Sequence, residues 1–356
     1  MESTWSGLNK EPMNLDVLRE RAQIVSAIRR FFDDDGFVEV ETAVRIPAPA
    51  PEEHIDCPPV EGGGFLRASP ELQMKKLLAA GLDKIYQIGP CFREGERGSR
   101  HNPEFTMIEW YRRGAGYLDI KADLENLFAS LAQPSNWFGG LRTQDSRLRA
   151  ACKPRPATTN ASTNWFGGLR TQDSRLRAAC KPRPTTTNAS TSQPPNFPTL
   201  KVRDAYRQHA GWDPWTDWDQ DRFDFDMATK IEPAIREMGG GVFLTDYPPQ
   251  AASLAKLSPF PAEPGLRFAE RWEFYFDGME LANCFTELCD GEEQRRRFEK
   301  AKAARQALGE ADYPIDEDFL ARLDSIGSAA GVALGVDRLV MVLLGVKDIS
   351  AVRAEV

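Results

Sequence analysis

The stretch Gly331-Val-Ala-Leu-Gly-Val-Asp-Arg-Leu-Val-Met-Val-Leu-Leu-Gly345 joins a strand of small residues directly to an apolar helix. The pattern predicts that strand and helix meet near Gly335, with Arg338 in the first turn of the helix. An arginine at a helix N-terminus opposes the helix dipole. We therefore expect Arg338 to face an anion rather than to stabilise the helix.

A second polar stretch lies between two strands predicted at Ile85–Arg93 and Phe105–Arg112. The loop Glu94-Gly-Glu-Arg-Gly-Ser-Arg-His-Asn-Pro103 is rich in Arg, Glu and Gly, and guanidinium groups bind phosphate in a bidentate manner. The loop is therefore expected to hold a polyphosphate. His101 could take part in acid–base chemistry or could serve only as a hydrogen-bonding spacer in the loop. A lone histidine in a polar loop is more often such a spacer.

The dipeptide Asp277-Gly278 predicts a tight hairpin between Trp272–Phe276 and Met279–Leu288. Pairing Tyr275 with Glu280 makes Glu273 and Glu280 diagonal neighbours on one face. Mg²⁺ between the two carboxylates would relieve their repulsion, but a solvated face with basic neighbours fits equally well. By simple alternation Asn283, Phe285 and Glu287 point the other way, so one shared pocket would require a bulge.

The remaining signals indicate a mixed α+β chain. A helix is predicted from about Asp16 to Asp35, followed by a strand at Phe37–Glu41. Ser69-Pro70-Glu71 predicts the start of another helix, with Ser69 as its cap. Capping alone explains those three residues, and a role in a site is the open alternative.

Composition narrows the class of protein. The 356 residues are 41% hydrophobic and 28% charged, as in a globular protein. No apolar stretch is long enough to span a membrane, and the N-terminus does not resemble a signal peptide. The six cysteines lack metal-binding spacing. We expect a cytoplasmic protein without a membrane partner.

Residues 136–163 recur at 164–191, and the two copies differ only at Ala157 and Thr185. Together they carry a net charge of +8, whereas the whole chain carries −8. Such near-identity is not typical of stacked structural repeats. We interpret residues 136–196 as a duplicated basic insertion of low complexity, expected to be disordered. A basic arm that binds nucleic acid or an acidic protein is the alternative.

Taken together, these motifs resemble the class II aminoacyl-tRNA synthetases. Phe92-Arg93 with His101-Asn-Pro-Glu-Phe105 is similar to their motif 2, Gly331–Arg338 to motif 3, and Gly36–Glu41 with its preceding helix to motif 1. Ser69–Glu71, Glu104–Tyr111 and Glu280–Glu287 resemble the lysine-specific branch. The resemblance implies a catalytic domain over residues 14–356, with an antiparallel sheet flanked by helices and the insertion within it.

Two departures refine the resemblance. Lysyl-tRNA synthetases carry an N-terminal anticodon-binding domain, whereas about a dozen residues precede the first predicted helix here, and Ala333 replaces a usual glycine. Both features resemble the elongation factor P–(R)-β-lysine ligases, free-standing paralogues of those synthetases. They imply ATP-dependent activation of lysine or (R)-β-lysine as an aminoacyl-adenylate, then transfer to a lysine ε-amine of elongation factor P. They also imply a homodimer formed through the motif 1 helix.

The resemblance also implies a role for each site residue. Arg93, Glu280 and Arg338 are the implied catalytic residues, and Glu273 and Glu280 the implied Mg²⁺ ligands. Motif 2 usually has glutamate where Gly95 stands, so either Glu94 or Glu96 is the implied ATP contact. The implied ATP-binding residues are Arg93, Glu94, Glu96, Asn102, Phe105, Glu280, Leu281, Gly335 and Arg338. The implied lysine-binding residues are Ser69, Glu71, Tyr111, Asn283, Glu287 and Ala333.

Two other functions remain open from the sequence. One is a synthetase-like enzyme that charges tRNA or another amine with lysine, which the missing anticodon-binding domain disfavours. The other is an inactive regulatory paralogue, which the presence of Arg93, Glu280 and Arg338 disfavours. Charge does not separate tRNA from an acidic protein partner, since the basic insertion would attract either.

Overall fold

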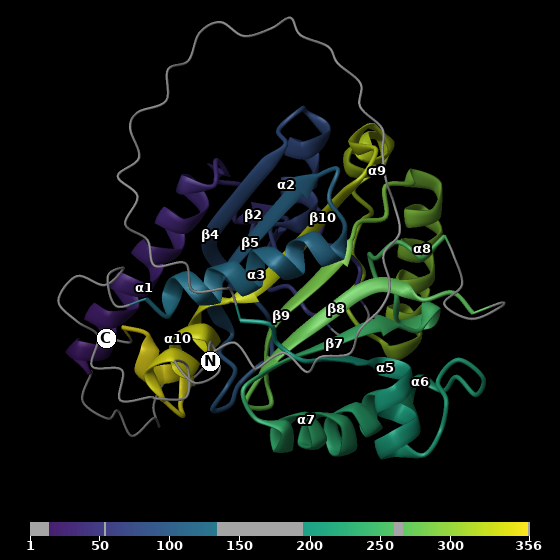
Figure 1. Ribbon diagram of the computed structural model, residues 1–356. Coiled ribbons are helices and arrows are strands. Elements are labelled where there is room, and N and C mark those ends of the chain that lie inside the picture. The colour runs from purple at the N-terminus through teal and green to yellow at the C-terminus, as the bar shows by residue number, and fades with distance from the viewer. Residues whose placement is uncertain (1–13, 53–54, 134–194, 260–265, 355–356) are drawn as a thin grey trace, which may run out of the picture.

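The computed structural model describes residues 14–52, 55–133, 195–259 and 266–354. Within these residues, a central eight-stranded sheet has the order β1-β4-β5-β10-β9-β8-β7-β6 and carries helices on both faces (Figure 1). Only its edge pairs β1–β4 and β6–β7 are parallel. The strands are β1 (Val38–Glu39), β4 (Lys84–Phe92), β5 (Glu104–Arg113), β6 (Thr199–Lys201), β7 (Gly241–Tyr247), β8 (Ala269–Phe276), β9 (Met279–Thr286) and β10 (Ala329–Gly335), with β2 (Arg45–Ile46) and β3 (Phe65–Leu66) forming a separate pair.

The helices divide between the two faces of the sheet. Successive residues of a strand point to opposite faces of the sheet. Trp110 therefore packs on the face covered by α1, α3 and α10, and Tyr111 packs on the face covered by α2 and α9. The helices are α1 (Leu15–Asp34), α2 (Glu71–Ala79), α3 (Tyr117–Leu131), α5 (Val202–Ala205), α6 (Gln220–Asp226), α7 (Glu232–Met238), α8 (Gly291–Leu308), α9 (Glu317–Leu323) and α10 (Val336–Leu344). Short π-helical turns lie at Tyr206–Ala210 and Met227–Ile231, and 3-10 turns at Pro249–Ala251, Asp324–Ile326 and Ile349–Val352.

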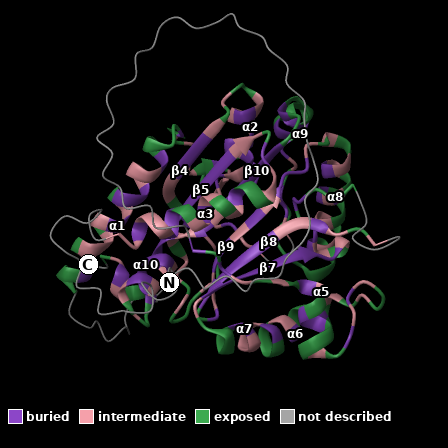
Figure 2. Ribbon diagram, in the orientation of Figure 1, coloured by how far each residue is buried: buried purple, intermediate pink, exposed green. Residues whose placement is uncertain are grey.

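The interior of the sheet is the main core of the molecule. The strands β7, β8 and β10 are largely buried, as are the middle parts of β4 and β5, while exposed residues gather on the outer sides of the helices (Figure 2). Phe32 of α1 lies within 5.1 Å of Trp110 and 5.0 Å of Tyr86 between ring centres. These aromatic contacts fix α1 against the strand pair β4–β5. The polar loop at residues 94–103, called the motif 2 loop below, joins these two strands.

Most of the predicted elements are confirmed within a residue or two. Asn14 caps α1 by accepting hydrogen bonds from the main-chain N–H groups of Asp16 and Val17. The predicted strand at Phe37–Glu41 is shorter, since only Val38–Glu39 pairs with β4. The predicted cap of α2 is displaced by one residue: Pro70 is the N-cap, although the Ser69 hydroxyl still accepts from the N–H of Glu71 at 2.9 Å.

Nearly all of the predicted insertion at 136–196 lies outside the described residues. The chain on its two sides is close together, because Phe197 packs its ring 5.7 Å from that of Phe128 near the end of α3. The main-chain N–H of Phe197 also donates to Glu125 of the same helix. Among the described residues, no helix is long and apolar enough to cross a membrane.

Candidate active site

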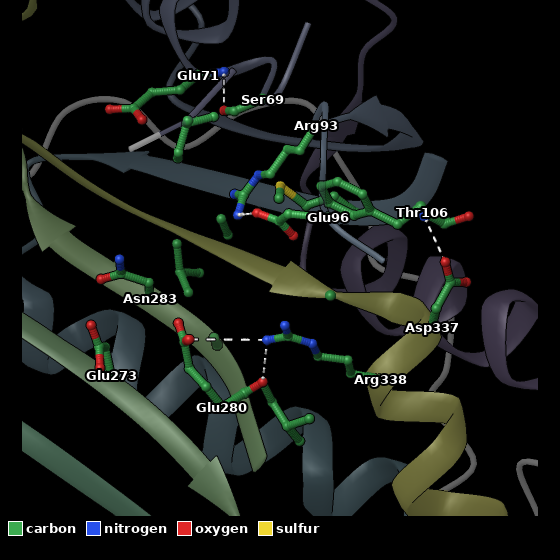
Figure 3. A pocket seen from close by; sticks show the side chains of 18 of the residues that line it. Ser69, Glu71, Arg93, Glu96, Thr106, Glu273, Glu280, Asn283, Asp337 and Arg338 are labelled. Carbon is green, nitrogen blue, oxygen red and sulfur yellow. Dashed lines mark hydrogen bonds and ion pairs between the residues drawn. The ribbon is translucent and has the colours of Figure 1, made fainter. Parts of the chain in front are cut away.

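A cavity of about 460 Å³ opens on the face of the sheet formed by β5, β8, β9 and β10. One end is acidic and carries Glu71 and Asn283, whereas the other carries Arg338 at the start of α10 (Figure 3). Arg93 reaches in between them from the end of β4. The predicted site residues that line it are Ser69, Glu71, Arg93, Glu96, Asn102, Phe105, Tyr111, Glu273, Glu280, Leu281, Asn283, Glu287, Ala333, Gly335 and Arg338.

A bulge in the β8–β9 hairpin brings both sets of polar side chains to this cavity. Tyr275 pairs with Glu280 as predicted, but Phe274 pairs with Ala282, so Leu281 is an extra residue in β9. The extra residue reverses the alternation beyond it. Asn283 and Glu287 therefore line the same cavity as Glu280 and do not point away, as simple alternation had predicted.

Arg338 is held in place by main-chain carbonyl groups. Its guanidinium donates to the carbonyl oxygens of Glu280 (3.0 Å) and Arg100 (3.2 Å). A third guanidinium nitrogen, Nη2, lies 2.7 Å from Nε2 of His101. Burial and the Arg338 charge lower the pKa of His101. His101 is therefore a hydrogen-bonding partner of Arg338, in agreement with the spacer interpretation.

The neighbouring Asp337 joins the start of α10 to β5. Its carboxylate is buried, and it accepts from the main-chain N–H of Thr106 (2.8 Å) and from Arg21 of α1 (2.6 Å). The bond between Thr106 and Asp337 holds the start of β5 against the start of α10. Asp337 lines the cavity but was not among the predicted site residues.

Arg93 lies over the ring of Phe105, 5.3 Å from its centre, and is 3.4 Å from a carboxylate oxygen of Glu96. Its buried Nε–H has no acceptor among the described residues. The Arg93 side chain as a whole is 27% exposed, so the outer part of its guanidinium is accessible to an anionic ligand in the cavity. This corner of the cavity is therefore suited to a phosphate group.

Of the two glutamates expected to contact ATP, Glu96 lines the cavity and Glu94 does not, so the structure favours Glu96 for this contact. The chain reverses at Gly95, which has a positive φ of 78°, and the main-chain N–H of Glu94 is bonded to the carbonyl of Asp56. The reversal returns Glu96 towards Arg93 and leaves Glu94 outside.

Glu273 and Glu280 point the same way from adjacent strands (Figure 3). Both oxygens of Glu273 are already bonded, to Arg271 and to the Tyr275 hydroxyl, each at 2.6 Å. Within the described part of the chain, the Glu280 carboxylate has only a longer ion pair, at 4.0 Å, with Arg338. Burial together with Glu273 raises the pKa of Glu280 to about 7. Among the described residues there is no cluster of three or more metal-ligating side chains. Two carboxylates fit Mg²⁺ that is bound jointly with substrate phosphates.

The acidic end of the cavity contains a buried cluster of charges. Glu71 and Glu287 are both paired with Lys75, a buried residue of α2. Behind Tyr111, Glu109 accepts hydrogen bonds from the hydroxyls of Ser69 (2.7 Å) and Tyr111 (2.8 Å). Burial, followed by the charge of Glu71, raises the pKa of Glu109 to about 7. Burial raises that of Glu287 to about 8, against the attraction of Lys75.

Ala333 and Gly335 occupy the β10 wall. Ala333 pairs with Glu109 of β5 on one side and with Asn283 of β9 on the other. A Cβ added at Gly335 would meet only the Arg338 side chain, at 3.8 Å or more. The protein itself therefore does not require glycine at Gly335, and the open space beside it faces the cavity.

Several charged residues of the site were missed by the sequence analysis. Arg271 is bonded to Glu273 and Asn283 and lines the cavity, as does Glu52. Lys75 follows Glu71 by four residues, and that helical spacing was the signal that could have revealed it. The bond from Arg271 to Glu273 lies within β8, whereas its bond to Asn283 crosses to β9 and no sequence spacing indicates it.

Comparison with known proteins shows which family this chain resembles. The family described as tRNA synthetases class II (D, K and N) matches residues 2–354. A curated protein of Proteus mirabilis named elongation factor P–(R)-beta-lysine ligase is 36% identical over 95% of this chain and 94% of its own length. Proteins of the same name from Photorhabdus laumondii (34%; 95% and 94%) and Vibrio campbellii (31%; 99% and 98%) are also similar.

The chain belongs to the elongation factor P–(R)-β-lysine ligase family of class II tRNA synthetases. Membership in this ligase family confirms the predicted fold class, and the antiparallel centre of the sheet agrees with it. It also confirms the expectation of an ATP-dependent ligase. The inactive paralogue is correspondingly disfavoured.

Proposed function

We propose that this protein activates (R)-β-lysine with ATP and transfers it to the ε-amine of a lysine on elongation factor P. The names of the relatives support both the amino acid and the acceptor. One observation on the structure supports the proposal most: a single cavity has Glu71 and Glu287 at one end and Arg93 and Arg338 further along it. Such a cavity suits an amino acid with two ammonium groups placed beside a polyphosphate.

The first step joins the carboxylate of the amino acid to the α-phosphorus of ATP. A new P–O bond forms, the bond to the bridging oxygen of the β-phosphate breaks, and pyrophosphate leaves. Arg93 would contact the α-phosphate through the exposed part of its guanidinium and stabilise the charge of the transition state. Arg338 would contact the γ-phosphate. No general base is needed, because the nucleophile is already ionised.

The other ATP contacts follow from their positions in the cavity. Phe105 would stack on the adenine, Asn102 and Glu96 would contact the nucleotide, and Leu281 and Gly335 would border it. Glu280, assisted by Glu273, would hold Mg²⁺. When bound, the ion would neutralise part of the polyphosphate charge.

The amino acid would lie at the acidic end. Glu71, Tyr111, Asn283 and Glu287 would surround its ammonium groups. Ser69 would border them while its hydroxyl donates to Glu109, which lies behind Tyr111. Ala333 would border the amino-acid backbone. In the second step the ε-amine of the acceptor lysine attacks the adenylate carbonyl, an amide forms, and AMP and a proton leave.

The proposal includes a homodimer, a cytoplasmic location and a single catalytic domain interrupted by the 136–196 insertion. Exposed apolar residues on α1 and β1 support the dimer: Leu15 is 56% exposed and Val38 is 49% exposed. Light scattering on the purified protein tests it, and a monomeric mass at micromolar concentration would count against it.

The function itself is tested by incubating the enzyme with ATP, (R)-β-lysine and elongation factor P. A mass increase of one β-lysyl group on the factor is the expected result. Charging of tRNA with α-lysine in place of that modification would support the synthetase alternative.

A further inference from the structure

Lys75 already lies where the proposed pocket should receive positive charge. It is on α2, four residues after Glu71, and its Nζ is 2.5 Å from Oε1 of Glu71. The same Nζ forms an ion pair with Oε2 of Glu287 on β9. One helix and one strand are thus joined through a single ammonium group. Each carboxylate still has a second oxygen that Lys75 does not contact.

Lys75 is placed so that it stays in the pocket. Its side chain is fully buried, and the neighbouring residues Leu72, Met74 and Leu78 anchor α2 in the core. Burial disfavours the charge, but Glu287 and Glu71 outweigh it and raise the pKa of Lys75. An ammonium group that is buried and doubly paired has no solvated alternative. It therefore remains as a fixed part of the site when a ligand enters.

The charges at the acidic end of the cavity show what the fixed ammonium group of Lys75 contributes. Glu71 and Glu287 together can carry two negative charges, and Lys75 supplies one positive charge. Two carboxylates in one buried pocket do not both ionise unless cations compensate them. With Lys75 present, one further ammonium group makes this part of the pocket neutral. Without Lys75, the same ammonium group would compensate only one of the two carboxylates, and the other would have to stay protonated.

We propose that Lys75 is a positioning residue for the amino acid: it supplies the resident half of the countercharge for Glu71 and Glu287, and a substrate ammonium group supplies the other half. This inference rests on the proposed function, because it concerns the pocket that the proposal assigns to the amino acid. Lys75 acts through the two carboxylates and does not touch the substrate or ATP.

The test is the substitution Lys75→Met, which keeps the length of the side chain and removes its charge. ATP–pyrophosphate exchange is measured while (R)-β-lysine and ATP are varied separately. The expected result is a KM for the amino acid that is at least tenfold higher, with kcat and the KM for ATP within threefold of the wild-type values. A general structural defect would lower kcat or raise both KM values.

Lys76→Met is the matched control, since Lys76 lies on the same helix but pairs with Asp316 and Asp318, away from the cavity. It should leave both KM values within threefold. Lys75→Gln serves as the second variant should Lys75→Met not fold, because it keeps an amide donor but no charge. It too should raise the KM for the amino acid at least tenfold. A wild-type KM in either folded Lys75 variant overturns the inference.

Failure of the proposed function is distinguishable from failure of this inference. A wild-type enzyme without exchange activity towards any lysine isomer would overturn both. An active wild-type enzyme whose KM for the amino acid is insensitive to Lys75→Met would overturn only the role of Lys75.

Discussion

Arg338 of α10 donates a hydrogen bond of 3.0 Å to the main-chain carbonyl of Glu280, the second residue of β9. Its guanidinium also lies 4.0 Å from the Glu280 carboxylate. The start of α10 and the start of β9 therefore share one cation. This relationship places the proposed γ-phosphate contact beside the proposed metal ligand, although the two residues are far apart in the chain.

Removal of the Arg338 guanidinium should strongly impair activation of the amino acid. Arg338→Ala is expected to lower kcat/KM for ATP–pyrophosphate exchange by about 10²- to 10³-fold, or about 3 to 4 kcal/mol of transition-state stabilisation. Arg338→Lys should be intermediate, because lysine keeps the charge but not the planar fork. The control Arg19→Ala changes an exposed arginine of α1 and should have no effect on exchange. Equal activity of Arg338→Ala and the control would contradict the assignment.

The geometry of the motif 2 loop predicts different outcomes for two nearby glutamates. Glu96→Gln should raise the KM for ATP several-fold, because Glu96 faces the cavity beside Arg93. Glu94→Gln, which alters a side chain outside the cavity, should stay within threefold of wild type. Exchange assays with varied ATP compare the two variants directly. The reverse order of effects would mean that the loop rearranges when ATP binds.

Glu109 predicts a pH dependence of stability. Its pKa is raised from 4.5 to about 7, so the folded protein keeps a proton that the unfolded chain releases. Its contribution to the free energy of unfolding is complete below pH 4.5 and is lost as the pH rises through 7. Because Glu109→Gln does not titrate, the stability of wild type relative to this variant should fall by about 1 kcal/mol per pH unit between pH 5 and 7.

Urea unfolding at pH 5, 6 and 7 measures this difference, with Glu299→Gln on the exposed side of α8 as the control. The control should follow the wild-type curve at every pH. Parallel curves for wild type and Glu109→Gln would show that Glu109 is ionised throughout this range.

The basic insertion should be dispensable for activation. Deletion of residues 136–191 is expected to leave ATP–pyrophosphate exchange within threefold of the full chain, since Phe128 and Phe197 hold the two flanking segments together. Deletion of only one copy, residues 164–191, is the matched control. Loss of soluble expression in the longer deletion alone would show that one copy is part of the fold.

Short sequence motifs were sufficient to predict many residues of the cavity, but not its buried charged residues. The Asp277-Gly278 turn predicted the Tyr275–Glu280 pairing, which the structure confirms. The polar loop after Arg93 was expected to hold a polyphosphate, and residues of this loop line the cavity. The bulge at Leu281 was not predicted as such, since nothing in its sequence distinguishes it from a regular strand residue. Its effect was nevertheless decisive, because it turned Asn283 and Glu287 into the cavity.

Long-range pairing explains the remaining gaps. Arg271 bonds a residue on its own strand and one on the next strand, and Asp337 bonds Arg21 across 316 positions of the chain. Such contacts depend on how the sheet and α1 are assembled, which periodicity does not encode. Glu94 and Glu96 illustrate the same limit at short range, because only the turn at Gly95 determines which carboxylate faces Arg93.

The most direct test of the proposed function compares α-lysine and (R)-β-lysine in ATP–pyrophosphate exchange, followed by transfer to elongation factor P or to tRNA. We predict a preference for (R)-β-lysine and a covalent β-lysyl group on the factor, with no charging of tRNA. Preference for α-lysine together with tRNA charging would contradict the account and make the enzyme a lysyl-tRNA synthetase.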